Sequence, residues 1–387
     1  WPISYEETYR HLDGAKEILD IADKPLEGYS FEGWTDKRFR IATYALSKPT
    51  RFGIKYRQEI EESEAITCLY NANATDLDIS DDGSRADKVK IAGYDGRREE
   101  VSAARFVVAL GGLENPRFML NSVDKNGQAL GNESDWVGRT FMEHFQCRFG
   151  IFTQMDESFW SQYMSPLHRG NGRPLLPSFE LMEREGIANG TVSIHPASKT
   201  KFYGRLAMMR RVRRDVNCTV PRLKAGIQAS GQNLICDGEG YFGSILEHLP
   251  NRDSRVMVDP NDLDPFGKGR MRLKYEILDR DLHTIRTLGL EVGKAFAEMN
   301  IGRARINTGT LNGTPKIEAH AHHMGTTRMA STPSYGVVDE NCRIFSKENV
   351  YVAGSSVFST GGGVNPTLTL VSLALRLGEH LGEQLNG

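Results

Sequence analysis

Long apolar runs and an excess of positive charge are both missing from this 387-residue sequence. The mean hydropathy is −0.44, and no apolar stretch approaches the roughly 18 residues that a membrane-spanning helix needs. Lys and Arg number 48 against 50 Asp and Glu, a formal net charge of −2, whereas nucleic-acid-binding proteins concentrate positive charge. The composition therefore predicts neither a membrane span nor a nucleic-acid partner.

Cysteine is scarce and shows no metal-binding or redox spacing. The five cysteines are Cys68, Cys147, Cys218, Cys236 and Cys342. None belongs to a CxxC pair of the kind that zinc sites and redox dithiols use. An odd number leaves at least one thiol unpaired, so at most two disulfides can form. We expect no metal site and no full disulfide framework.

Glycine, by contrast, is abundant. The 39 glycines are about one residue in ten, above the usual ~7%, and no low-complexity tract accounts for them. Many backbone positions are therefore expected to lie in tight turns or in close contact with another group. The length suits one large domain or two coupled domains.

Periodicity predicts both helices and strands. Helical spacing follows Ser4, a plausible N-cap with Glu7 three residues later, and a long helix is expected at 281–299. Alternating apolar residues predict short strands at 65–70, 75–91, 256–258 and 271–277. A continuous apolar run at 105–110 predicts a buried strand, which leads through a glycine pair into a helix with Pro116 at its first position.

The C-terminal region repeats this arrangement. A strand at 349–353 enters a glycine-rich loop, and a helix follows with Asn365 as N-cap and Pro366 at its first position. The N-terminus of a helix carries unpaired N–H groups and about half a positive charge, so it stabilises an adjacent anion. Phosphate and a reduced flavin ring are both candidates, and an ordinary α/β connection would have the same pattern.

Three histidines, His320, His322 and His323, lie just before Met324 and Gly325. They could ligate zinc, but no fourth ligand has a familiar spacing. A histidine is also the usual side chain for taking a proton from an alcohol at neutral pH, and a structural role is the third possibility.

These residues resemble the glucose-methanol-choline (GMC) family of flavin oxidoreductases. The stretch from His322 to Thr326 resembles the family's HxMGT motif, and the C-terminal strand, loop and helix resemble the end of its members. Further strings similar to the family occur in order at residues 1–5, 107–120, 138–144 and 249–256.

The resemblance implies FAD-dependent oxidation of an alcohol, with a sugar or glycoside hydroxyl as the substrate group. By position in the motifs, His322 is the base that accepts the hydroxyl proton and Asn365 orients the substrate oxygen, while hydride passes to flavin N5. The flavin-contacting candidates are Gly111, Gly112, Gly354, Ser355, Pro366 and Thr367. In the string at 138–144, we expect His144 to be structural or to contact substrate, and Arg139 to pair with Glu143 across a helical turn.

The implied architecture is a mixed α/β fold with two domains. A Rossmann-like FAD-binding domain comprises residues 1–145 and 320–387, and an antiparallel-sheet substrate-binding domain comprises residues 146–319. The family's GxGxxG turn, which holds the dinucleotide pyrophosphate, is missing, so the FAD-binding domain is incomplete in this chain.

Three explanations for the missing turn stay open. A second polypeptide supplies the dinucleotide-binding unit, or the unit has been cut from a longer chain. Alternatively, the scaffold serves a flavin-free or non-redox role, as a binding subunit or a hydroxynitrile-lyase-like enzyme.

Overall fold

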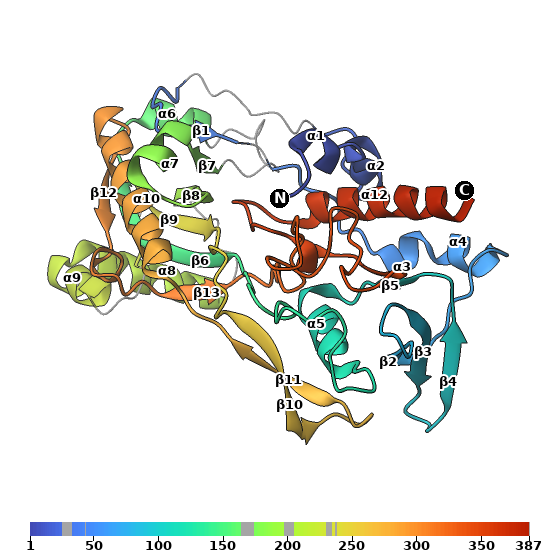
Figure 1. The fold of residues 1–387 in the computed structure, drawn as a ribbon. Coiled ribbons are helices and arrows are strands. Elements are labelled where there is room, and N and C mark those ends of the chain that lie inside the picture. The colour runs from blue at the N-terminus through green and yellow to red at the C-terminus, as the bar shows by residue number, and fades with distance from the viewer. Residues whose placement is uncertain are drawn as a thin grey trace.

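The computed structural model describes residues 1–24, 33–42, 44–163, 174–196, 205–229, 234–236 and 238–386. These residues form a mixed α/β fold, as predicted, with two hydrophobic cores (Figure 1). One core draws on residues 77–142 and 324–377, and the other draws on residues 39–41 and 145–301. The predicted two-domain division of the chain stays a prediction.

A seven-stranded antiparallel sheet, called here the large sheet, supports the second core. Its main path runs in the order β1, β7, β8, β9, β6, β12, and β13 also pairs with β6. The strands are β1 (Phe39–Ile41), β6 (Phe145–Gln154), β7 (Leu175–Pro177), β8 (Gly190–Pro196), β9 (Glu239–Leu246), β12 (Gly302–Ile306) and β13 (Ile317–Ala319). Along β6, Phe145, Cys147 and Phe149 are buried on one face, which is the alternation expected of a strand with one face in a core.

The predicted long helix covers that buried face. Helix α10 (Asp279–Glu298) places a stripe that includes Ile285, Leu288, Val292 and Phe296 in the second core, and Figure 1 shows it lying across the large sheet. Other helices of this half are α6 (Glu157–Tyr163), α7 (Phe179–Glu185), α8 (Arg205–Thr219), α9 (Pro221–Ala229) and α11 (Thr308–Leu311). A disulfide joins Cys218 at the end of α8 to Cys236, within the limit of two that the cysteine count sets.

A buried carboxylate holds the start of α10. Asp281 is fully buried, and it accepts hydrogen bonds from the backbone N–H groups of Leu278 (2.8 Å) and Leu249 (3.2 Å). The imidazole Nε2 of His248 lies 3.5 Å from the same carboxylate. Burial raises the pKa of Asp281, so the side chain relies on these partners.

Replacing Asp281 with Ala should lower the free energy of unfolding by about 2–4 kcal/mol, because it removes an N-terminal helix cap and leaves buried N–H donors without an acceptor. Asp281→Asn keeps one acceptor oxygen and should lose less. Urea denaturation followed by circular dichroism measures both variants. An Ala variant as stable as wild type would contradict this account.

The first core is built around two parallel strands, β5 (Phe106–Val108) and β14 (Val350–Val352). Helix α5 (Gly111–Asn121) follows β5. After β14 come the short 3-10 helix η2 (Ser355–Val357) and helix α12 (Thr367–Asn386). The meander β2 (Asn73–Ile79), β3 (Ala86–Ala92) and β4 (Arg98–Ser102) lies beside them, and β10 (Arg255–Leu263) pairs with β11 (Gly269–Lys274). The predicted meander and the two later strands are confirmed.

Pro116 lies inside α5 and not at its first position, which corrects the sequence prediction. A proline lacks the N–H that would bond to the carbonyl four residues earlier, here that of Gly112. The Thr326 hydroxyl donates to this carbonyl instead, at 2.6 Å. The proline therefore leaves an acceptor that ties α5 to the segment containing the histidine cluster.

The N-terminal prediction is wrong in one respect. The single helix expected after Ser4 is two short helices, α1 (Tyr5–Thr8) and α2 (Leu12–Ile18). The Ser4 side chain does accept from the backbone N–H of Glu7 (3.1 Å). The Glu7 carboxylate completes no capping box and pairs with Arg376 of α12 (2.8 Å) and with Arg10 (2.6 Å).

Residues 65–70 are not a strand, contrary to the prediction. Their apolar side chains Ile66 and Leu69 are exposed, so the alternation of apolar residues does not correspond to a buried face. The preceding helices are α3 (Phe52–Lys55) and α4 (Arg57–Glu62). Among the helices in the described part of the chain, none is long and apolar enough to cross a membrane.

Candidate active site

The histidine segment, residues 320–323, directly follows β13. Glu143, two residues before the start of β6, holds its backbone. Glu143 is buried, and its Oε1 accepts from the backbone N–H groups of His322 (2.7 Å) and His320 (3.3 Å). Its Oε2 lies 3.3 Å from Nε2 of His323. One carboxylate thus contacts three residues of the segment, His320, His322 and His323.

Hydrogen bonds determine which nitrogen of His144 carries its proton. Its Nε2 lies 2.8 Å from the carbonyl oxygen of Gly362 and 3.2 Å from that of Gly361. A carbonyl can only accept, so Nε2 carries the proton. Burial lowers the pKa of His144, which keeps the ring neutral at pH 7 and leaves Nδ1 as an acceptor.

The same reasoning assigns the tautomer of His322. The two Nδ1 atoms of His144 and His322 are 2.9 Å apart, and because the one on His144 is an acceptor, His322 donates from Nδ1. The lone pair of His322 is therefore on Nε2. A chain of hydrogen bonds runs from the Gly362 carbonyl through His144 to His322. It fixes the tautomer of His322, so that Nε2 is its basic nitrogen.

Asn365 lies at the basic nitrogen of His322. Its Nδ2 is 3.2 Å from His322 Nε2, across a separation of 43 residues. His322 is half-buried and Asn365 is exposed, so solvent reaches the pair. Burial, together with repulsion from charge on His144, His320 and His323, lowers the pKa of His322 to about 4.

This arrangement has a defined chemical capability. A neutral imidazole offers a lone pair on Nε2, and an amide beside it offers N–H donors. A hydroxyl group placed between them would find an acceptor for its proton and a donor for its oxygen. The structure brings together the two residues selected from the sequence as catalytic; their roles stay predictions.

Open space lies beyond the two parallel strands. Gly111 follows β5 with φ +93°, and a Cβ there would meet nothing within 4 Å; Gly354 follows β14 with φ +115°, and a Cβ there would meet only Asn115 Nδ2, at 3.9 Å. Ligands of α/β folds bind outside the carboxyl ends of parallel strands. The two glycines leave room for a ligand to approach the backbone, and their contact with flavin stays a prediction.

Two other predicted flavin-contacting residues touch the histidine segment. A Cβ on Gly112 would lie 2.3 Å from the carbonyl oxygen of His323, so close packing against that backbone explains the glycine. The hydroxyl of Ser355 donates to the same carbonyl, at 2.7 Å. Both residues are buried, and both position the residues that follow His322.

The glycine-rich loop after β14 also packs closely against other residues of the chain. A Cβ on Gly363 would lie 2.8 Å from Asn189 Oδ1. Helix α12 begins at Thr367, one residue later than predicted, and the carbonyl of Pro366 accepts from Leu370 N (2.9 Å). Pro366 is buried and Thr367 is exposed. Their predicted contact with flavin stays a prediction.

Sequence reasoning missed the role of Glu143. The expected pair between Arg139 and Glu143 is wrong, since Arg139 bonds to Asp135 (Nε to Oδ2, 3.0 Å). Residues 139–143 are not helical, and Thr140 has φ +53°, so the spacing of a helical turn does not apply. A carboxylate next to His144 in a family-like string was the available signal. Within the described residues, no cluster of His, Cys, Asp or Glu is arranged to hold a metal ion.

Comparisons with known proteins show which proteins this chain resembles. Residues 250–374 match the family model described as GMC oxidoreductase. A C-glycoside 3-oxidase from Microbacterium trichothecenolyticum is 30% identical over 321 residues, covering 82% of this chain and 54% of that protein. The fructose dehydrogenase large subunit of Gluconobacter japonicus is 23% identical over 303 residues, covering 74% of this chain and 48% of that protein.

The chain spans about half the length of these curated relatives. Among solved structures, pyridoxine 4-oxidase from Mesorbium loti aligns with a TM-score of 0.60 at 15% identity. The alignment covers 99% of this chain and 70% of that one, which supports the fold.

Proposed function

Because the chain belongs to the GMC oxidoreductase family, we propose that it forms the catalytic part of an FAD-dependent enzyme that oxidises an alcohol group of a sugar or glycoside. The observation that carries the proposal is the pairing of His322 Nε2 with Asn365 Nδ2 at 3.2 Å. When bound, FAD supplies the acceptor for the hydride that leaves the carbinol carbon.

The residues of the chain handle the proton. His322 accepts it from the hydroxyl on Nε2, and Asn365 donates a hydrogen bond to the oxygen as negative charge develops there. His144 keeps the accepting nitrogen free, and the Glu143 carboxylate, bonded to the backbone N–H of His322, offsets the positive charge that the ring acquires. Gly111, the first residue of α5, would lie next to the flavin.

The rate of flavin reduction, which depends on proton removal by His322, should stay high well into the acid range. A base must be unprotonated, so activity is full above its pKa and falls as the pH drops through that value. With the pKa of His322 at about 4, the rate of flavin reduction should reach half its plateau near pH 4. Stopped-flow measurements between pH 3.5 and 8 give the profile. A midpoint near the ordinary histidine pKa of ~6.5 would contradict this assignment.

The dinucleotide-binding turn is proposed to come from elsewhere. One of the relatives is named as the large subunit of its enzyme, which supports a partner polypeptide, and we propose that such a partner carries that unit. Intact mass and the visible spectrum of the purified protein test this. Flavin bands together with a second polypeptide would support the proposal. Flavin absorbance absent even after FAD is added to the chain and its partner would contradict it.

A further inference from the structure

A buried carboxylate, that of Glu247, contacts the glycine-rich loop next to His144. Glu247 directly follows β9 of the large sheet and is 8% exposed. Its Oε1 accepts from the backbone N–H of Gly362 (2.8 Å), and its Oε2 accepts from that of Asn189 (3.2 Å). In the described part of the chain, these two N–H groups are the only hydrogen-bond partners of the carboxylate, and no cation pairs with it. Because a buried carboxylate needs its hydrogen bonds, we expect both contacts to be kept.

One peptide group connects Glu247 to His144. The carbonyl of Gly361 and the N–H of Gly362 belong to the same planar trans peptide, in which they point in opposite directions. The N–H side donates to Glu247, and on the other side the carbonyl oxygen lies 3.2 Å from Nε2 of His144. The next carbonyl, that of Gly362, lies 2.8 Å from the same nitrogen. The position of the carboxylate thus determines where both acceptors of His144 lie.

The loop depends on such outside contacts to keep its conformation. Residues 361–363 are three consecutive glycines, and Gly362 has φ +66°. Glycine has more backbone freedom than any other residue, so this run does not fix its own course. A Cβ on Gly361 would lie 3.7 Å from Glu247 Cγ and 3.7 Å from His144 Nε2. The loop therefore lies directly between the two side chains.

We propose that Glu247 is a positioning residue for His322. By holding the peptide between Gly361 and Gly362, it keeps the two carbonyls directed at Nε2 of His144, so the proton of His144 stays on that nitrogen. Through the contact of 2.9 Å between the two Nδ1 atoms, the proton of His322 then stays on Nδ1. That the free Nε2 of His322 takes a substrate proton rests on the proposed function. The setting of the two tautomers does not.

Glu247→Met and Glu247→Gln test the proposal as a pair, because both remove the charge and both nearly keep the size of the side chain. Gln retains an oxygen that can accept from Gly362, whereas Met has no comparable acceptor. In ¹⁵N-histidine-labelled protein at pH 7, the Met variant should show His144 and His322 as mixed tautomers, and the Gln variant should resemble wild type. The rate of flavin reduction should fall about 10- to 100-fold in the Met variant and by less in the Gln variant.

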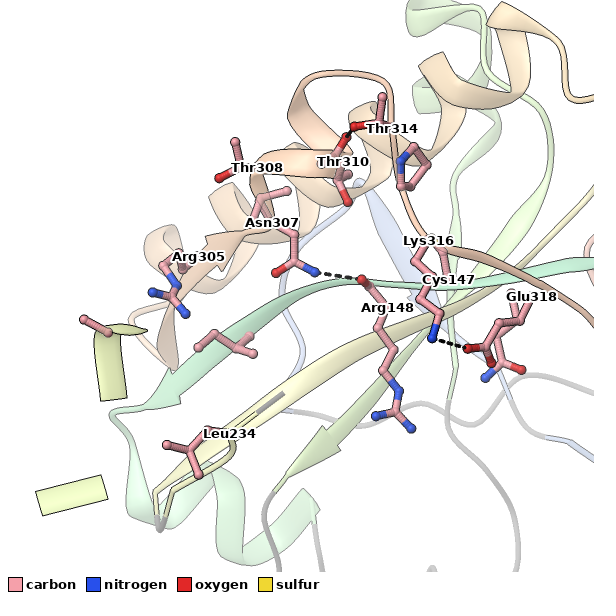
Figure 2. Close-up of a pocket in the computed structure, with 16 residues that line it drawn as sticks. Cys147, Arg148, Leu234, Arg305, Asn307, Thr308, Thr310, Thr314, Lys316 and Glu318 are labelled. Carbon is pink, nitrogen blue, oxygen red and sulfur yellow. Dashed lines mark hydrogen bonds and ion pairs between the residues drawn. The ribbon is translucent and has the colours of Figure 1, made fainter. Parts of the chain in front are cut away.

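Two control variants make the same change elsewhere. Glu291→Met removes another buried carboxylate, one on α10 that pairs with Lys294 at 2.5 Å. Glu318→Met removes a carboxylate from β13, just before the histidine segment in the sequence. Figure 2 shows that Glu318 lines a cavity of about 710 Å³ and points to Lys316, 3.4 Å away. Both controls should leave the ¹⁵N signals of His144 and His322 unchanged.

Wild-type ¹⁵N signals in Glu247→Met would overturn the proposal, and so would equal changes in the Met and Gln variants or in either control. If the Met variant does not fold, Glu247→Asp replaces it, since its carboxylate is one methylene too short to reach Gly362, and the same mixed tautomers are expected. Urea denaturation measures any loss of stability separately. The tautomers are measured without turnover. Mixed tautomers without a slower flavin reduction would therefore support the positioning role and count against His322 as the base, whereas unchanged tautomers would leave that base intact.

Discussion

His322→Ala should slow the reduction of bound flavin by at least about a hundredfold while the protein keeps its flavin. A positioned acid or base contributes about 10²- to 10⁴-fold. The whole imidazole is lost, with its hydrogen bond to His144, but the backbone N–H of residue 322 can still donate to Glu143, so the backbone of the histidine segment should keep its position.

Anaerobic stopped-flow mixing with a sugar or glycoside substrate measures the rate, and the absorbance spectrum measures the flavin content. His283→Ala serves as the matched control, because His283 is an exposed histidine on α10 that bonds only to the carbonyl of Glu185 (2.8 Å). His322→Gln guards against misfolding, since the carboxamide retains polar atoms in the site. Near-wild-type flavin reduction in both His322 variants would sink the assignment of the base.

The sequence allowed His322 and Asn365 to be selected, since each lies in a short motif with a distinctive neighbour. Strands such as 105–110 and 349–353 were also legible, because a buried parallel strand is a continuous apolar run that ends in glycine. These features are local, and local signals survive in a single sequence.

The contacts that hold the site in place could not be predicted from local patterns in the sequence. Glu143 meets the backbone of His322 across 179 residues, and nothing near Glu143 in the sequence specifies that contact. The helical spacing assumed between Arg139 and Glu143 fails at the positive φ of Thr140. Pro116 resembled a helix start because its missing N–H is usually harmless only there, and the hydroxyl that makes it tolerable inside α5 comes from Thr326.

The role of His144 is the second large effect that the structure predicts. Replacing His144 with Leu removes the acceptor that fixes the proton of His322 on Nδ1. The ring can then place its proton on either nitrogen, and molecules protonated on Nε2 cannot act as the base. Partners that fix a histidine tautomer are worth about 10- to 100-fold where they have been measured in metal sites, and we expect a loss of that size in the rate of flavin reduction.

His144→Asn should recover part of the rate. Its carboxamide oxygen can take the place of the imidazole Nδ1 and accept from His322, whereas Leu cannot. Asn leaves a larger cavity than Leu, so packing alone would make His144→Asn the more damaging change. A loss in the Asn variant as large as that in the Leu variant would therefore indicate a structural role for His144 and not the setting of a tautomer.

The tautomer itself is open to measurement without turnover. In ¹⁵N-histidine-labelled protein, His322 should show a protonated Nδ1 and an unprotonated Nε2 at pH 7, and in His144→Leu the two nitrogens should shift toward a mixed population. The pKa of His322 should also rise, since repulsion by charge on the His144 ring is one cause of its depression. The midpoint of the acid limb of flavin reduction would then move upward from about pH 4. Unchanged ¹⁵N shifts in the Leu variant would show that Glu143 and the backbone alone orient His322.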